Sequence, residues 1–185
     1  MFTLVSWNIQ YGKGVDGRID LRRIAETVHK DGLPDVLCFQ EVSRNYPSTD
    51  EGADQVRELE NFFPDYEPFF GAVHDRSGRK GKARKQFGNL VLSRLSPVQV
   101  LHHLLPSPAD PEVKFMSRQI AELVIPANTT DLRVMTTHLE FFSEIQQLAQ
   151  IQRIREIHEE AFNQFHNPGK DMQYTPFELV KRPEK

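Results

Sequence analysis

Five polar side chains lie in or beside stretches that are otherwise apolar, and their types suit phosphate-ester chemistry. They are Asn8, Glu41, Asn89, Arg118 and His138. A carboxylate and an amide oxygen suit a hard cation such as Mg²⁺, with Mn²⁺ as an alternative, and the thiolates that would indicate zinc are missing. Arginine and histidine beside such a cation suit a phosphate ester, whose transition state gathers negative charge on its oxygens. We therefore expect a single metal-dependent site instead of five unrelated polar residues.

Glu41 is the central residue of this hypothesis. It follows the apolar block Val36–Phe39, which Gly32 and Pro34 precede. Such a block predicts a strand that is buried on both faces. A carboxylate at the carboxyl end of that strand would be held at the rim of a sheet, where a metal ion or ligand can reach it. The alternative is a strand-end acid that simply turns out into water.

The elements before Glu41 predict which residue lies beside it. A strand is expected over residues 2–9, followed by a helix that Asp20 caps, and then the strand ending at Glu41. A strand–helix–strand crossover normally places its two strands parallel in one sheet. Asn8 and Glu41, both late in their strands, should therefore lie at the same edge.

The later elements define the class. Strands are predicted over residues 66–73, 87–94, 98–105, 117–125 and 132–139, with a short helix over 53–63 and a turn at 128–131. The early strands are joined by a helix and the later ones by turns, so we expect mixed sheets and an α/β or α+β class with sheet packed on sheet. A long helix should begin at Ser143, which with Gln146 makes a capping box. Its predicted buried face consists of Ile145, Leu148, Ile151, Ile154, Ile157, Ala161 and Phe165.

Residues 76–85 form a basic segment in which six of ten residues are lysine or arginine. It is either a solvated hairpin tip or a loop that contacts the phosphates of a polyanionic substrate. No stretch interleaves aromatic and basic residues in the manner of an RNA-binding platform. His102 and His103 are adjacent, so they should point to opposite faces of a strand and cannot easily chelate one ion.

Length and composition set further bounds. The 185 residues suffice for one domain, and a formal net charge of -3 argues against a wholly electrostatic nucleic-acid binder. Cys38, the single cysteine, excludes an internal disulfide and is expected to be a small buried residue. The sequence predicts neither a signal peptide nor a membrane-spanning segment, and the expected location is cytoplasmic.

Four segments together resemble the endonuclease/exonuclease/phosphatase family, which includes pancreatic deoxyribonuclease, abasic-site endonucleases, sphingomyelinases and inositol polyphosphate 5-phosphatases. They are Ser6-Trp7-Asn8-Ile9, Leu37 to Val42 (LCFQEV), Gly88 to Arg94 (GNLVLSR) and Thr136-Thr137-His138-Leu139. The resemblance runs through residues 2 to about 165. It implies a four-layered sandwich of two mixed β-sheets with outer helices. It also implies that Glu41 is the principal metal ligand, that Asn8 lies beside metal and phosphate, that His138 binds the scissile phosphate, and that Arg118 and Asn89 support them.

The chain departs from that family after its long helix. The family continues with a strand ending Gly-Asp-Phe-Asn and later a Ser-Asp-His, which supply the general base and further site groups, and this sequence has neither. We therefore expect residues 1–185 to be one domain that is incomplete at its carboxyl end. Two functions stay open: a phosphoesterase acting on nucleic acid or a smaller ester, or a catalytically inactive binding module. Taken alone, the chain should show little hydrolysis and should dimerise or exchange strands to cover an exposed face.

Overall fold

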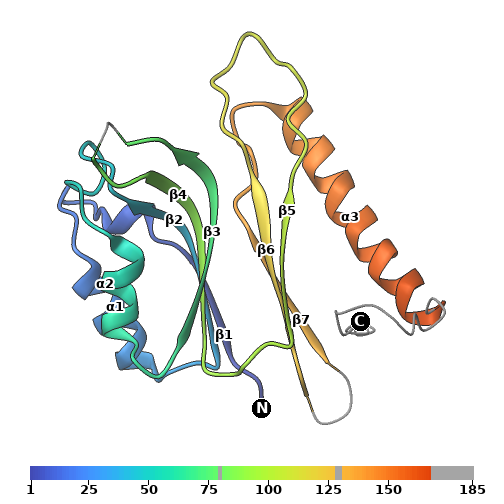
Figure 1. Ribbon diagram of the computed structural model, residues 1–185, viewed down its shortest axis with the longest axis horizontal. Helices are drawn as coiled ribbons and strands as arrows, with labels where there is room; N and C mark the ends of the chain where they lie inside the picture. Colours follow the sequence, from blue (N-terminus) through green and yellow to red (C-terminus); the bar gives the residue numbers. More distant parts are fainter. Residues whose placement is uncertain (79–80, 128–130, 168–185) are drawn as a thin grey trace.

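The chain folds into four layers, with two sheets face to face and helices outside them (Figure 1). The computed structural model describes residues 1–78, 81–127 and 131–167. Helices α1 (Leu21–Asp31) and α2 (Gln55–Phe62) cover the outer face of the first sheet, and α3 (Glu144–His166) lies on the outer side of the second. Asp20 caps α1 by accepting bonds from Arg22 N and Arg23 N. The predicted layered sandwich is therefore confirmed.

The first sheet is mixed and contains the predicted crossover. It consists of β1 (Leu4–Asn8), β2 (Val36–Arg44), β3 (Glu67–Arg76) and β4 (Lys85–Ser93), in the order β1-β2-β4-β3. Strands β1 and β2 are parallel and joined through α1, whereas β4 is antiparallel to both of its neighbours. Because Asn8 pairs with Gln40 in this register, the chain places Asn8 next to Glu41.

The second sheet is antiparallel throughout its described part. It consists of β5 (Gln99–Leu104), β6 (Gln119–Ile125) and β7 (Leu132–Thr137), in that order. His138 directly follows β7, and Arg118 directly precedes β6. Since β6 and β7 run in opposite directions, these two residues meet at one end of the second sheet.

Two hydrophobic layers hold the sandwich together. Between the sheets lie Val36, Cys38, Val91, Ala121, Leu123, Ile125 and Val134. Between the first sheet and its helices lie, among others, Leu37, Phe39, Leu90 and Leu92 with Leu21, Val28, Leu59 and Phe63. Successive residues of β2 alternate between the two layers, so its central block is apolar on both faces as predicted.

The buried face of α3 differs from the prediction in its first half. Ile157 and Ala161 are fully buried, but Ile145, Leu148 and Ile151 are 58%, 58% and 36% exposed. The residues buried there instead are Gln146 and Gln150, whose amides donate to Pro108 O and Pro106 O at 2.9 and 3.3 Å. The loop before β6 brings these carbonyls to the first turns of the helix. Buried carbonyl groups need hydrogen-bond donors, so polar side chains face them.

The predicted capping box at the start of α3 is only half formed. Ser143 Oγ accepts from Gln146 N at 3.2 Å, which is the expected N-cap bond. The Gln146 side chain does not return to the cap residue, because its amide donates to Pro108 O.

The basic segment at 76–85 connects two longer strands than the sequence predicted. Arg76 ends β3 and Lys85 begins β4. Arg84 Nε contacts Asp75 Oδ1 at 2.6 Å, and Lys85 Nζ lies 5.9 Å from the centre of the Tyr46 ring. Arg79 and Lys80 lie outside the described residues.

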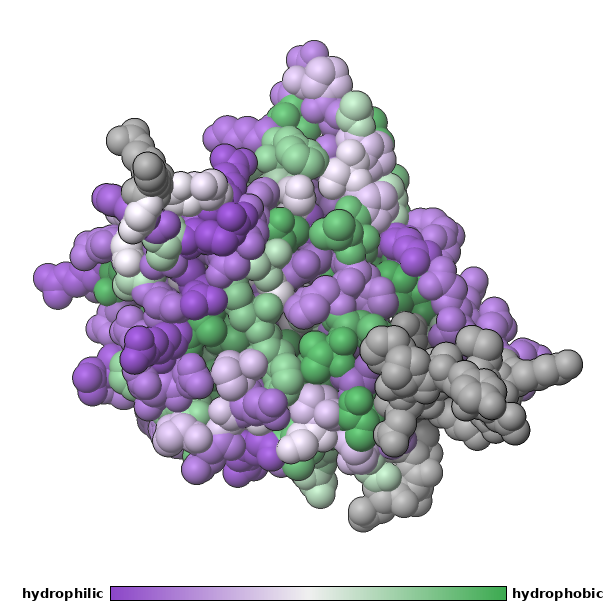
Figure 2. Space-filling view, in the orientation of Figure 1, coloured by the Kyte–Doolittle hydropathy of each residue, from purple (hydrophilic) through white to green (hydrophobic). Residues whose placement is uncertain are grey.

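The hydropathy of the surface differs between the layers. Hydrophilic residues dominate over α1 and α2, whereas hydrophobic residues gather over the middle of the same view, where the two sheets meet (Figure 2). No helix among the described residues is long and apolar enough to cross a membrane.

Candidate active site

Glu41 lies within β2 and not at its end, because the strand continues to Arg44. Phe39 pairs with Leu90 and Val42 with Gly88, so β2 carries one extra residue between these pairs. This is a β-bulge, and Glu41 occupies it with φ of 60°. A left-handed backbone costs a residue other than glycine about 1–3 kcal/mol, and bulges re-aim side chains. The predicted strand end is therefore wrong, and the carboxylate is aimed by a bulge.

Asn8 holds the Glu41 carboxylate in place. Its Nδ2 donates to Glu41 Oε1 at 3.2 Å, and its own Oδ1 accepts from Gln10 N at 3.0 Å. Gln10 and Tyr11 also have positive φ angles, 47° and 44°. Three left-handed residues other than glycine therefore lie around one carboxylate, a concentration of strain that is typical of functional sites.

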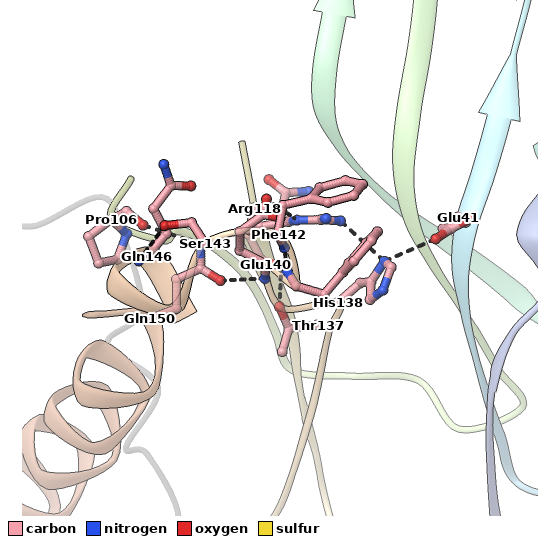
Figure 3. Close-up of polar contacts among 12 residues, drawn as sticks. Glu41, Pro106, Arg118, Thr137, His138, Glu140, Phe142, Ser143, Gln146 and Gln150 are labelled. Carbon is pink, nitrogen blue, oxygen red and sulfur yellow. Dashed lines mark hydrogen bonds and ion pairs between the residues drawn. The ribbon is translucent and has the colours of Figure 1, made fainter. Parts of the chain in front are cut away.

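His138 meets Glu41 across the gap between the sheets. Its Nδ1 lies 3.3 Å from Glu41 Oε1 and 3.2 Å from Arg118 Nη1 (Figure 3). Burial lowers the pKa of His138, the Arg118 charge lowers it further, and the carboxylates of Glu41 and Glu140 oppose both effects. The two largest effects therefore favour the neutral ring. An arginine N–H can only donate, so when Arg118 bonds to Nδ1 the ring proton is on Nε2. A carboxylate can only accept, so when Nδ1 bonds to Glu41 the proton is on Nδ1.

Arg118 forms an ion pair with Glu140, a residue that the sequence patterns did not indicate. Arg118 is 4% exposed, Glu140 is fully buried, and their Nε and Oε2 atoms are 3.5 Å apart. Burial lowers the pKa of Arg118, while the Glu140 charge raises it. Glu140 Oε1 also accepts from Phe141 N and Phe142 N at 2.8 and 2.9 Å. The only sequence signal for Glu140 was an acid two residues after His138, beyond the end of β7.

One N–H group of the Arg118 guanidinium is left without an acceptor in the part of the chain that the structure describes. Its Nη2 is buried and has no hydrogen-bond partner among the described residues. A buried donor without a partner is costly, and a site that receives an anion would satisfy it.

Asn89 does not join this cluster. It is buried between the sheets, where its Nδ2 donates to Gln119 O at 3.3 Å and so connects β4 to β6. Gln40 makes a similar connection, since its Nε2 donates to Thr136 Oγ1 at 2.7 Å. Of the five predicted site residues, Asn8, Glu41, Arg118 and His138 come together, and Asn89 lies in the core.

A cleft of about 580 Å³ opens onto the cluster. Glu41 and Arg118 line it together with His74, whose pKa is lowered by burial and by the charges of Arg76 and Arg118. The remaining lining is mostly aromatic and basic, and it includes Tyr11, Tyr46, Phe87, Phe115, Phe141, Phe142, Arg76 and Lys114. The cleft therefore offers both positive charge and apolar surface beside Glu41 and Arg118.

The cluster fits a hard divalent ion held mainly by water. Among the described residues, no group of three histidine, cysteine, aspartate or glutamate side chains is arranged to hold a metal. Glu41 instead offers one carboxylate, whose Oε1 accepts from Asn8 Nδ2 and lies 3.3 Å from His138 Nδ1. Mg²⁺ typically keeps several waters and binds through one or two carboxylates, so the donors present suit that ion.

Comparison with solved structures shows the same fold. An endonuclease/exonuclease/phosphatase from Beutenbergia cavernae DSM 12333 is 25% identical, with a TM-score of 0.68 over 87% of this chain and 45% of that chain. A protein of the same family from Leptotrichia buccalis C-1013-b is 15% identical, with a TM-score of 0.62 over 84% of this chain and 61% of that one. TDP2 from Caenorhabditis elegans is 21% identical, with a TM-score of 0.58 over 91% and 44%. This chain therefore spans about half the length of the solved proteins that it resembles.

A search of curated protein sequences found no match. The family model of the Endonuclease/Exonuclease/phosphatase family, in contrast, matches residues 5–159. That span includes both sheets and all four clustered residues, Asn8, Glu41, Arg118 and His138. By this match, which covers most of its length, the chain belongs to the Endonuclease/Exonuclease/phosphatase family.

Proposed function

We propose that this chain carries the metal-binding and phosphate-binding groups of a phosphoesterase that hydrolyses phosphodiesters or phosphomonoesters. Family members are generally hydrolases that act on phosphate esters. The observation that carries the proposal is the convergence of Glu41, His138 and Arg118 from two different sheets, beside a cleft that Glu41 and Arg118 line. The unpartnered Nη2 of Arg118 supports it further, because a phosphate oxygen is the acceptor that this donor lacks.

In this proposal Glu41 holds Mg²⁺, with Mn²⁺ as the alternative ion, and Asn8 fixes the carboxylate through its amide. The bound ion would neutralise charge that develops on the phosphate oxygens. Asn8 presents Nδ2 to Glu41 and already uses Oδ1 for Gln10 N, so it acts through Glu41 more readily than as a direct ligand.

Arg118 and His138 bind the phosphate. Arg118 donates from Nη2, and the buried charge of Glu140 keeps the guanidinium in position. In the proposal His138 donates from Nε2 as a neutral ring, with its Nδ1 accepting from Arg118 and not donating to Glu41. In this arrangement His138 has no free acceptor nitrogen, so it serves as a hydrogen-bond donor and not as the general base.

The test is a titration of Mg²⁺ and Mn²⁺ into the chain and into Glu41→Gln, with two readouts. One is hydrolysis of bis-p-nitrophenyl phosphate and of a plasmid. The other is the thermal midpoint, which an ion bound only to the folded state raises. Glu51→Gln is the matched control, because Glu51 is exposed, also has a positive φ of 56°, and lies outside the cluster.

We expect the ion to raise the thermal midpoint of the wild-type chain and of Glu51→Gln but not of Glu41→Gln. Metal-dependent hydrolysis that Glu41→Gln abolishes would support the full proposal. Glu41-dependent stabilisation of the fold by the ion, without hydrolysis, would support the metal site and favour a binding module. The absence of both effects would contradict the proposal.

A further inference from the structure

We propose that Phe141 and Phe142 form a stacking surface for an unpaired nucleobase, which makes single-stranded nucleic acid the substrate class of this site. The inference rests on the proposed phosphoesterase function. It concerns residues that the hydrolytic chemistry itself does not require.

The aromatic pair is exposed yet held rigidly. Phe141 and Phe142 are 60% and 48% exposed, and their ring centroids are 4.3 Å apart. Both backbone N–H groups donate to Oε1 of the fully buried Glu140. Large exposed rings are unusual on a surface, and a backbone that a buried carboxylate holds limits the entropy that the pair loses when a flat ligand lies on it.

The pair adjoins the phosphate-binding groups. The Phe141 ring stacks on His138 with centroids 5.7 Å apart and planes inclined by 23°. Arg118 Cζ lies 5.5 Å from the centre of the same ring. A ligand bound to Arg118 and His138 through its phosphate would therefore have the aromatic pair beside it. In a nucleotide the base occupies that position relative to the phosphate.

Positive charge extends from this point along the cleft. Lys114 Nζ lies 5.9 Å from the centre of the Phe142 ring, and Arg76 lines the same cleft. Both side chains are exposed, and neither forms an ion pair with an acid among the described residues. A groove that both rings and cations line suits a strand with several phosphates better than a small ester with one phosphate.

The geometry favours a single strand over a duplex. In a duplex both faces of each base are covered by neighbouring bases, so a base could reach Phe141 and Phe142 only after it is unstacked and flipped. An unpaired base offers its face at no such cost.

The test is binding measured in the Glu41→Gln background, which prevents turnover. Fluorescence anisotropy would follow a labelled single-stranded DNA 12-mer and the same strand in a duplex. We expect the single strand to bind more tightly. Replacing both rings in Phe141→Leu/Phe142→Leu should weaken single-strand binding about 5- to 150-fold, the range for loss of base–aromatic stacking, and should hardly change duplex binding.

Two controls separate stacking from loss of structure. Phe162→Leu removes a 42% exposed ring from α3, away from the cleft, and should leave binding unchanged. Phe141→Trp and Phe142→Tyr keep an aromatic face and should retain binding. A terminal 2-aminopurine in the strand gives an independent readout on the unmodified rings, because stacking on the pair quenches its fluorescence.

Equal single-strand affinity for the chain with and without the two rings would overturn the inference, as would preference for the duplex or unchanged 2-aminopurine fluorescence. Failure to bind either DNA would overturn it too. In that case Glu41-dependent hydrolysis of bis-p-nitrophenyl phosphate would still support the phosphoesterase proposal, so the two proposals fail separately.

Discussion

Arg118 and Glu140 form a buried ion pair beside the candidate site. Arg118 is 4% exposed and Glu140 fully buried, so each charge relies on the other for compensation. Removing one partner of a buried pair leaves an uncompensated charge, which costs about 3–5 kcal/mol. We expect Arg118→Met to lower the free energy of unfolding by about that amount, as measured by urea denaturation.

The double variant Arg118→Met/Glu140→Gln provides the control. Without a buried charge it should lose at least about 1 kcal/mol less than the sum of the two single variants, because contacting residues couple. Glu140→Gln keeps an acceptor for Phe141 N and Phe142 N. Additive losses would show that the two side chains do not compensate each other.

Cys38 gives a prediction about pH. It is 2% exposed between the sheets, and burial raises the pKa of its thiol to about 11. The thiol therefore stays protonated in the folded chain, and its contribution to stability is lost as pH rises from about 8.5, the usual thiol pKa, toward that value. At pH 8 the native chain should not react with Ellman's reagent, whereas the urea-unfolded chain should release one equivalent. Rapid reaction of the native chain would contradict this burial.

At the scale of elements, the sequence predicted what repeats along the chain and missed what depends on tertiary contacts. The burial of both faces of β2 and the crossover through α1 follow from local patterns, so Asn8 and Glu41 were correctly expected to be neighbours. The bulge at Glu41 could not be predicted, because a one-residue mismatch arises only from the pairing with β4. The apolar periodicity of α3 likewise gave the wrong face, since the carbonyls that bind its glutamines come from a distant loop.

The bulge at Glu41 should lower the stability of the fold while it positions the carboxylate. Glu41 has φ of 60°, which glycine adopts without the penalty that an L side chain pays. We expect Glu41→Gly to unfold with a free energy about 1 kcal/mol higher than Glu41→Gln, while both variants lose metal-dependent stabilisation. Glu51→Gly, at φ of 56°, should show a similar gain over Glu51→Gln and keep the metal response. A Glu41→Gly variant that is less stable than Glu41→Gln would argue against strain at this position.

The corrected face of α3 can be tested by two opposite substitutions. Gln150→Leu leaves Glu140 N and Pro106 O without their partner, and unsatisfied buried groups cost about 1–3 kcal/mol each. We expect this apolar substitution to destabilise the chain by about 2 kcal/mol or more. Leu148→Gln, at a 58% exposed position, should change stability by less than about 0.5 kcal/mol. If Leu148→Gln destabilised the chain more than Gln150→Leu in thermal or urea unfolding, the buried face would be the one that the apolar periodicity predicts.

At the scale of the whole molecule, the site exists only because two sheets meet. Glu41 comes from the first sheet, while His138 and Arg118 come from the second (Figure 3). The family motifs indicated these residues but not the surface around them. Phe141 and Phe142 lie beside Lys114 and Arg76 only in the folded chain, so no local pattern of alternating rings and charges could indicate the cleft.

The outer surface of α3 leads to the last prediction. Ile145, Leu148 and Ile151 follow one another at three-residue intervals and are all exposed, which places a row of apolar side chains on one side of the helix. Exposed apolar rows of this kind drive association in water. We expect the 185-residue chain to self-associate with increasing concentration in sedimentation velocity experiments, and Ile145→Gln/Leu148→Gln to shift it toward the monomer of 21.4 kDa. Val15→Gln, which replaces an exposed apolar residue far from α3 in sequence, should leave the association unchanged. If the unmodified chain stays monomeric at every concentration, the row does not drive association. Equal shifts for Val15→Gln and the double variant would mean that general surface polarity, and not this row, controls self-association.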